Sequence, residues 1–189
     1  MTFRSILLTF AFVSALSVPA FAQVPIVRIY EDQSYSPFFH CGPQGTLHEF
    51  IVVLHNVDDV VSAVDFSIQY PASMIFLGDQ LPDGGYFNNE VILLGSSPTG
   101  VAVAWHSCCM TDASQGLVVL RPLIMWTGNC DCAQALVVGG YTPLGKTQPS
   151  FVRFADFTEH PALGSASPWI QCSVPVEPTT WGKVKSLYR

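Results

Sequence analysis

The 189-residue sequence predicts an all-β domain, folded as a two-sheet jelly-roll or immunoglobulin-like β-sandwich of about nine strands. After residue 22, apolar stretches alternate with segments rich in Gly, Pro, Asn and Asp, which is typical of strands joined by turns. Between residues 23 and 176, no segment shows the apolar spacing of a convincing amphipathic helix. The length corresponds to one domain that can bury a sizeable core.

Alternation and apolar character predict the individual strands. Segment 61–70 alternates most cleanly, because Val64 and Phe66 share one face with every second residue. Segment 47–57 is almost wholly apolar, as expected for a strand between two layers. Residues 79–89 are rich in turn formers and are expected to form a loop. The predicted strands are 24–30, 47–57, 61–70, 91–95, 101–107, 117–126, 135–138, 151–157 and 169–172.

Charged residues make up only 12% of the chain, against about 25% in ordinary soluble domains. Residues 23–176 hold four basic and 13 acidic residues, a balance of −9. This balance excludes a nucleic-acid-binding protein, since such proteins need basic residues to contact phosphates. The composition, 49% hydrophobic, also excludes a disordered chain and a coiled coil.

Residues 1–22 are expected to be a secretory signal peptide. Arg4 supplies the positive start, an apolar run of about 13 residues follows it, and Ala20-Phe21-Ala22 presents small residues at the cleavage site. The run is too short to span about 30 Å of hydrocarbon, so no transmembrane segment is expected. The mature chain, from Gln23, is therefore expected in the periplasm, on the cell surface or in the extracellular medium.

Six cysteines in an exported chain predict three disulfides, for which 15 connectivities are possible. One or two bridges could join the pair that ends one predicted strand to the pair that follows the next. That arrangement would leave the first and last cysteines for each other. The six are Cys41, Cys108, Cys109, Cys130, Cys132 and Cys172.

Two metal sites are alternatives to simpler interpretations. His106 with Cys108, Cys130 and Cys132 could hold zinc, although disulfides are favoured in an oxidising compartment. The loop at 79–89 and the residue after it place several carboxylate and amide oxygens together, and calcium is the only cofactor considered there. The calcium candidates are Asp79, Asp83, Asn88 and Glu90.

No catalytic signature is complete in this sequence. Adjacent aspartates at Asp58 and Asp59 could do acid–base work in a glycosidase-like secreted hydrolase, but such pairs are usually solvated turns. Sugar binding would need exposed aromatic rings. Trp105 and Trp126 are expected in the core, which leaves the loop residues Tyr86 and Phe87 as the possible ligand surface.

The C-terminal segment 174–189 differs from the domain at 23–173. It is expected to be a Pro-containing linker followed by a short basic, amphipathic helix. The tail could dock on the acidic body, bind a partner, serve as an address for surface attachment, or simply fray. Its apolar stripe consists of Trp181, Val184, Leu187 and Tyr188.

Residues 45–78, GTLHEFIVVLHNVDDVVSAVDFSIQYPASMIFLG, resemble the opening of cohesin-type domains. The resemblance implies the jelly-roll β-sandwich that cohesins share with related carbohydrate-binding modules, and a function in binding rather than catalysis. It suggests a secreted module for extracellular adhesion or assembly that recognises a protein or a polysaccharide. Tyr70-Pro71 lacks the Asp of the family's turn, and six cysteines are unusual in cohesins, so no dockerin-binding residue is assigned.

A non-reducing peptide map of the secreted protein tests the export and disulfide predictions together. We expect a chain that begins at Gln23 and a mass lower by about two units for each of three disulfides. Six free thiols, or zinc bound to the reduced protein, would contradict the disulfide prediction.

Overall fold

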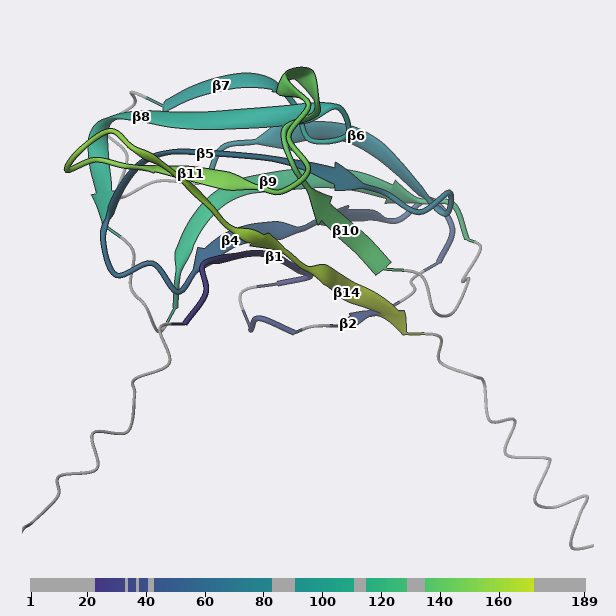
Figure 1. The fold of residues 1–189 in the computed structure, drawn as a ribbon. Helices are drawn as coiled ribbons and strands as arrows, with labels where there is room; N and C mark the ends of the chain where they lie inside the picture. The colour runs from purple at the N-terminus through teal and green to yellow at the C-terminus, as the bar shows by residue number, and fades with distance from the viewer. Residues whose placement is uncertain are drawn as a thin grey trace, which may run out of the picture.

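The computed structural model describes residues 23–32, 34–36, 38–40, 43–82, 91–110, 115–128 and 135–171, and it confirms the predicted two-sheet β-sandwich. Fourteen strands are assigned in this part of the chain (Figure 1). Within the same residues, no helix is long and apolar enough to cross a membrane. The predicted signal peptide, all the predicted tail residues, and Cys41, Cys130, Cys132 and Cys172 lie outside these residues.

The smaller sheet has six strands, and β9 lies between β6 on one side and β3 and β4 on the other. β1 pairs with β4 antiparallel and with β13 parallel. The strands of this sheet are β1 (Ile26–Tyr30), β3 (Leu47–Glu49), β4 (Ile51–His55), β6 (Met74–Gln80), β9 (Leu117–Trp126) and β13 (Leu163–Gly164).

The larger sheet has eight strands arranged around β5. β8 pairs with one side of β5 and carries β7 as its other neighbour, whereas β11 and β10 pair with successive parts of the opposite side. The strands are β2 (Phe38–His40), β5 (Val60–Gln69), β7 (Val91–Ser96), β8 (Gly100–Met110), β10 (Ala135–Gly139), β11 (Ser150–Arg153), β12 (Glu159–Pro161) and β14 (Ala166–Gln171).

The core lies between the two sheets and is formed by alternate residues of the facing strands. Val64, Phe66 and Ile68 of β5 are buried there, as the alternation in this segment predicts. Trp105 and Trp126 are buried in the same core, which confirms their expected structural role.

Strands β3 and β4 lie within the predicted strand 47–57, and both pair with β9. They are separated at Phe50. Opposite Phe50 lies Pro122, which accepts a hydrogen bond from the Phe50 N–H at 2.9 Å. Because proline has no N–H, it returns no hydrogen bond, and the ladder breaks into β3 and β4 at this point.

Several predicted strand boundaries are shifted by a few residues, and β6 has no counterpart among the predicted strands. Asp79 belongs to β6 rather than to a loop, because β6 pairs with β9 as far as Gln80. The strand predicted at 151–157 ends at Arg153, where the Asp156 carboxylate accepts hydrogen bonds from Thr158 and closes a turn. The strand predicted at 101–107 continues to Met110, because β5 pairs with it up to Val60.

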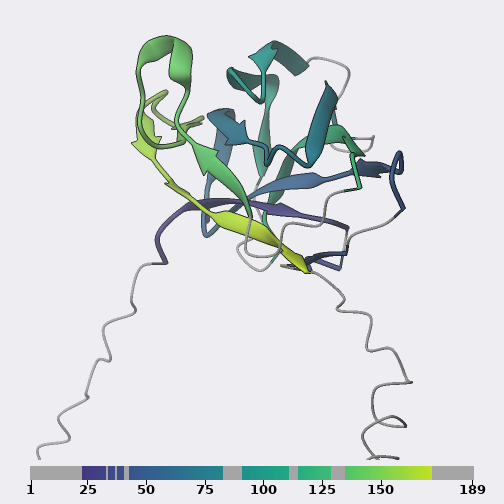
Figure 2. The same cartoon turned by 90° about the vertical axis from the view of Figure 1, so that its right-hand side faces the viewer.

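The segment from β13 to β14 joins the two sheets. On the smaller sheet, the Ser165 N–H donates to the Val27 carbonyl at 3.1 Å, and on the larger sheet, the Val138 N–H donates to the Ser165 carbonyl at 2.9 Å. In both views, the yellow-green β14 passes close to the purple β1 (Figures 1 and 2). A Cβ atom at Gly164 would overlap the Val138 carbonyl, so this crossing requires glycine.

We expect Gly164→Ala to destabilise the protein by about 2 kcal/mol or more, because the new methyl group has no room against a backbone carbonyl. Urea unfolding followed by tryptophan fluorescence measures this change. Gly78→Ala is the matched control, since a Cβ atom there meets nothing within 4 Å. Equal stability of the two variants would contradict the proposed crossing.

Candidate functional site

The outer face of the larger sheet has small residues at its centre. Register places Ile92 of β7 beside Ala104 of β8, and Ala104 beside Ala63 of β5. The next row runs from Leu94 through Ala102 to Asp65. Ile92 and Leu94 are 56% and 58% exposed, so the face has an apolar border beside the alanines. We call this surface, together with Ser150, Lys146 and Glu159 described below, the docking face.

The outer face of the smaller sheet is partly covered by its own chain. Tyr30, Ile51 and Val53 form a second buried cluster there, and Tyr35 packs against it. The Tyr30 hydroxyl lies 2.9 Å from His55 Nε2, and the Tyr30 and Tyr35 rings meet edge to face. This end of the smaller sheet is therefore closed, whereas Leu47, Ile75 and Leu77 at its other end are exposed.

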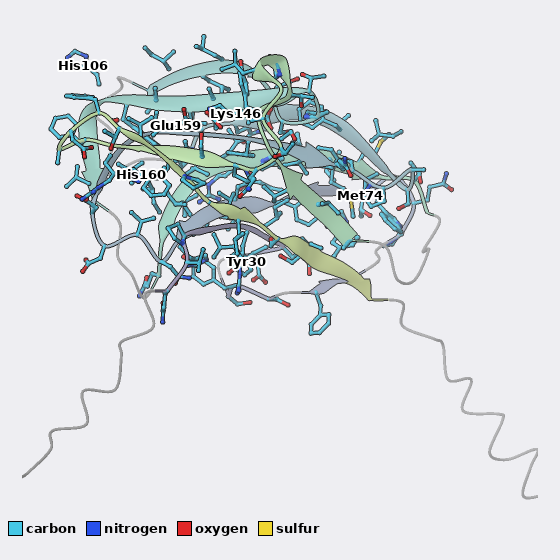
Figure 3. All side chains as sticks on the ribbon, in the orientation of Figure 1. Tyr30, Met74, His106, Lys146, Glu159 and His160 are labelled. Atoms are coloured by element: carbon cyan, nitrogen blue, oxygen red, sulfur yellow. The ribbon has the colours of Figure 1, made fainter. Side chains whose placement is uncertain are left out.

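Lys146 lies in the loop between β10 and β11 and holds this loop against the docking face. Its ammonium group donates hydrogen bonds to Asp65, to Glu159 at 2.5 Å and to the Ser150 hydroxyl at 3.0 Å. The Ser150 hydroxyl in turn donates to Asp65 at 2.8 Å. Figure 3 shows Lys146 and Glu159 on the same side of the molecule, away from Tyr30. The loop leaves a shallow hollow of about 390 Å³ beside this cluster.

Ion pairing fixes the charges of this cluster. Burial lowers the pKa of Lys146, but hydrogen bonds to Asp65 and Glu159 outweigh this effect and raise the pKa above its ordinary value. The hydrogen bond from Lys146 lowers the pKa of Glu159. A protonated Lys146 is a poor nucleophile or base. Half of the Glu159 side chain stays exposed and can meet a partner.

Asp79, one of the calcium candidates, is used inside the fold. Its carboxylate accepts hydrogen bonds from the N–H and the hydroxyl of Ser97, both at 2.7 Å. Burial raises the pKa of Asp79, and the hydrogen bonds from Ser97, which lower it, offset only part of this increase. The other candidates, Asp83, Asn88 and Glu90, lie outside the described residues, so the calcium site stays a prediction.

The remaining predicted sites are only partly visible. His106 lies exposed on β8, and the side chains of Cys108 and Cys109 are not described, although Cys109 pairs through its backbone with Val61. Tyr86 and Phe87 lie outside the described residues. Among those residues, no group of three or more His, Cys, Asp or Glu side chains could hold a metal ion. The disulfide, zinc and ligand-surface predictions stay predictions.

Asp59, proposed for acid–base work in the hydrolase alternative, forms an ion pair instead. It accepts a hydrogen bond from the Val60 N–H at 2.7 Å and one from Arg153 Nε at 2.6 Å. These two hydrogen bonds lower the pKa of Asp59. A carboxyl group held ionised in this way is unsuited to act as a general acid at neutral pH.

Sequence reasoning missed the Lys146 cluster. Alternation in segment 61–70 does place Asp65 on the face opposite Val64 and Phe66. Lys146 and Asp65 are 81 residues apart, however, and no spacing rule connects them. Only the pairing of β11 with β5 and β12 brings these groups together.

We expect Asp59→Asn to destabilise the protein near neutral pH, because Arg153 loses its anionic partner. The pKa of Asp59 is lower in the folded state, so its contribution is present above the ordinary Asp pKa and is lost as pH falls through the lowered value. Urea unfolding from pH 7 down to about 2 measures this change. Asp58→Asn, at an exposed neighbour, is the control. A difference from wild type that does not shrink at acid pH would contradict the assignment.

No family model and no curated protein matches this sequence. Solved structures do match the fold. A cohesin module from a Clostridium perfringens family 33 glycoside hydrolase aligns with a TM-score of 0.50 at 14% identity, covering 78% of this chain and 97% of that module. The sixth cohesin of Acetivibrio cellulolyticus scaffoldin B, solved with a Cel5 dockerin, gives 0.44 at 12% identity, covering 78% and 93%.

The seventh ScaB type I cohesin from Pseudobacteroides cellulosolvens aligns with a TM-score of 0.46 at 13% identity, covering 82% of this chain and 96% of that one. At such identities the likeness concerns the fold alone. Together with the two-sheet architecture, the match at 0.50 shows that this chain has a cohesin-like β-sandwich fold.

Proposed function

We propose that this chain is a secreted, non-catalytic module that binds a partner protein on its docking face and acts in extracellular adhesion or assembly. The small residues Ala63, Ala102 and Ala104 beside the exposed Ile92 and Leu94 carry this proposal. Small residues let a partner approach the sheet closely, and exposed apolar residues supply the area that becomes buried on binding.

Charge supports a protein partner with basic groups. The Lys146 cluster joins one ammonium group to two carboxylates and so has an excess of negative charge. The exposed Glu159 carboxylate lies at the border of the docking face, where it can pair with a Lys or Arg of the partner. The predicted signal peptide supports an extracellular location.

A protein partner is favoured over a polysaccharide on this face. Sugar-binding surfaces stack their ligand on exposed aromatic rings. The outward-facing residues that the structure describes on β5, β7 and β8 are aliphatic, small or polar, apart from the imidazole of His106. The polysaccharide alternative therefore depends on Tyr86 and Phe87, outside the described residues, or on exposed rings away from these strands, such as Phe154 and Phe157.

Binding measurements with arginine variants test the proposal. The probes are a panel of dockerin modules, chosen because of the cohesin resemblance at 45–78, a panel of polysaccharides, and extracellular proteins of the source organism. We expect a protein ligand whose affinity falls about tenfold or more in Ala63→Arg and Ala104→Arg, because the new side chain blocks close approach. Isothermal titration measures the affinities, with Ala155→Arg, at an exposed turn residue, as the matched control.

Two results would overturn the proposal. One is protein binding that is equally strong in Ala63→Arg, Ala104→Arg and Ala155→Arg. The other is binding to polysaccharides alone.

A further inference from the structure

Strand β7 is a long edge of the larger sheet. Its six residues pair with β8 without a register shift, from Val91 opposite Trp105 to Ser96 opposite Gly100. In the part of the chain that the structure describes, no strand pairs with the other side of β7. Its outer N–H and C=O groups are therefore available to another strand.

Strand β7 is more exposed than its apolar composition would predict. Four consecutive residues, 91–94, are Val, Ile, Leu and Leu, yet none is buried. Every other strand of four or more residues in the described part has at least one buried residue. Val91 and Leu93 pack against the core only in part, and Ile92 and Leu94 point outward. An apolar strand left half exposed indicates a surface that becomes covered on association.

The other edge strands among the described residues carry features that oppose strand pairing, and β3, for example, has three residues and includes Glu49. β12 has three residues that include Glu159 and Pro161, and β2 has three residues. β13 has two, one of which is the tightly packed Gly164. β6 has a register shift between Phe76 and Gly78 and carries Asp79. β7 has no charged residue, no proline and no register shift, so it lacks the usual protection.

We infer that two copies of this chain associate by antiparallel pairing of β7 with β7 about a two-fold axis at Leu93. This register brings Ile92 of each copy opposite Leu94 of the other, on the outer face of both sheets. Cross-strand pairs of this kind stabilise antiparallel sheets. The strand is thus complementary to itself, as an isologous interface requires.

The charge of the edge and the area that it can bury favour a second copy as the partner and predict how strongly the two copies associate. An uncharged edge meets its own copy without like-charge repulsion, although the acidic bodies repel each other at longer range. A typical stable interface buries about 1,600 Å², and pairing over residues 91–95 of each copy buries less, so we expect a weak, reversible dimer. Added salt screens the bodies and strengthens the dimer.

Pairing at β7 would have a consequence for the proposed binding function. The two larger sheets would continue into each other, and their docking faces would lie side by side on one surface. Such a dimer would present two binding sites to a partner with repeated modules, which raises the overall affinity without new contacts.

Sedimentation velocity of the full mature chain, from Gln23 to Arg189, tests this inference over about 5 to 500 µM protein at low and high salt. We expect a monomer–dimer equilibrium whose dissociation constant falls as salt rises. The double variant Ile92→Lys, Leu94→Lys should be monomeric throughout, because the charges would face each other across the axis. Both positions are more than half exposed, so the fold should tolerate lysine.

Two control variants separate this inference from the proposed function. Ile75→Lys, Leu77→Lys adds the same charges to β6, an edge strand of the smaller sheet, and should leave the dimer intact. Ala63→Arg should also dimerise, because Ala63 lies on β5, with β8 between it and the edge strand β7. Wild-type protein that stays monomeric, a dimer that survives lysine on β7, or one lost in Ala63→Arg would overturn the inference.

Discussion

The architecture depends on one short segment that hydrogen-bonds to both sheets. Leu163 donates to Pro25, and Ser165 donates to Val27 on the smaller sheet while accepting from Val138 on the larger one. This segment closes one side of the sandwich, because it holds the first strand, β1, close to the last strand, β14. The close approach leaves no room for a side chain at Gly164, so a single backbone position limits how the layers meet.

A buried polar group links the sheets at a second place. Ser97, in the turn between β7 and β8, is fully buried and bonds to Asp79 of β6 and to the Tyr70 hydroxyl at 2.9 Å. Burial raises the pKa of Asp79 and that of Tyr70, which is the cost of placing these groups between layers. The hydrogen bonds satisfy the buried atoms and hold the β7–β8 turn against β6.

With its layers joined, the molecule leaves the outer face of the larger sheet open, and the features of this face support the proposed binding function. Three of the four basic residues of the body, Arg121, Lys146 and Arg153, form ion pairs with carboxylates. These three basic side chains therefore hold strands and loops together. On the docking face, Ile92, Leu94 and the alanines lie near the Asp65 and Glu159 carboxylates, which supports the proposed binding of a protein with complementary groups.

Local patterns in the sequence determined the number of layers, the buried face of segment 61–70 and the core positions of both tryptophans, because side chains alternate along a strand and apolar ones leave water. They also placed Asp65 on the outer face. Only the tertiary structure decided the short strands β2, β12 and β13, the paired Lys146, Asp65 and Glu159, and the exposed edge of β7. Each of these depends on which distant strands become neighbours, and that pairing has no signature within a few residues of sequence.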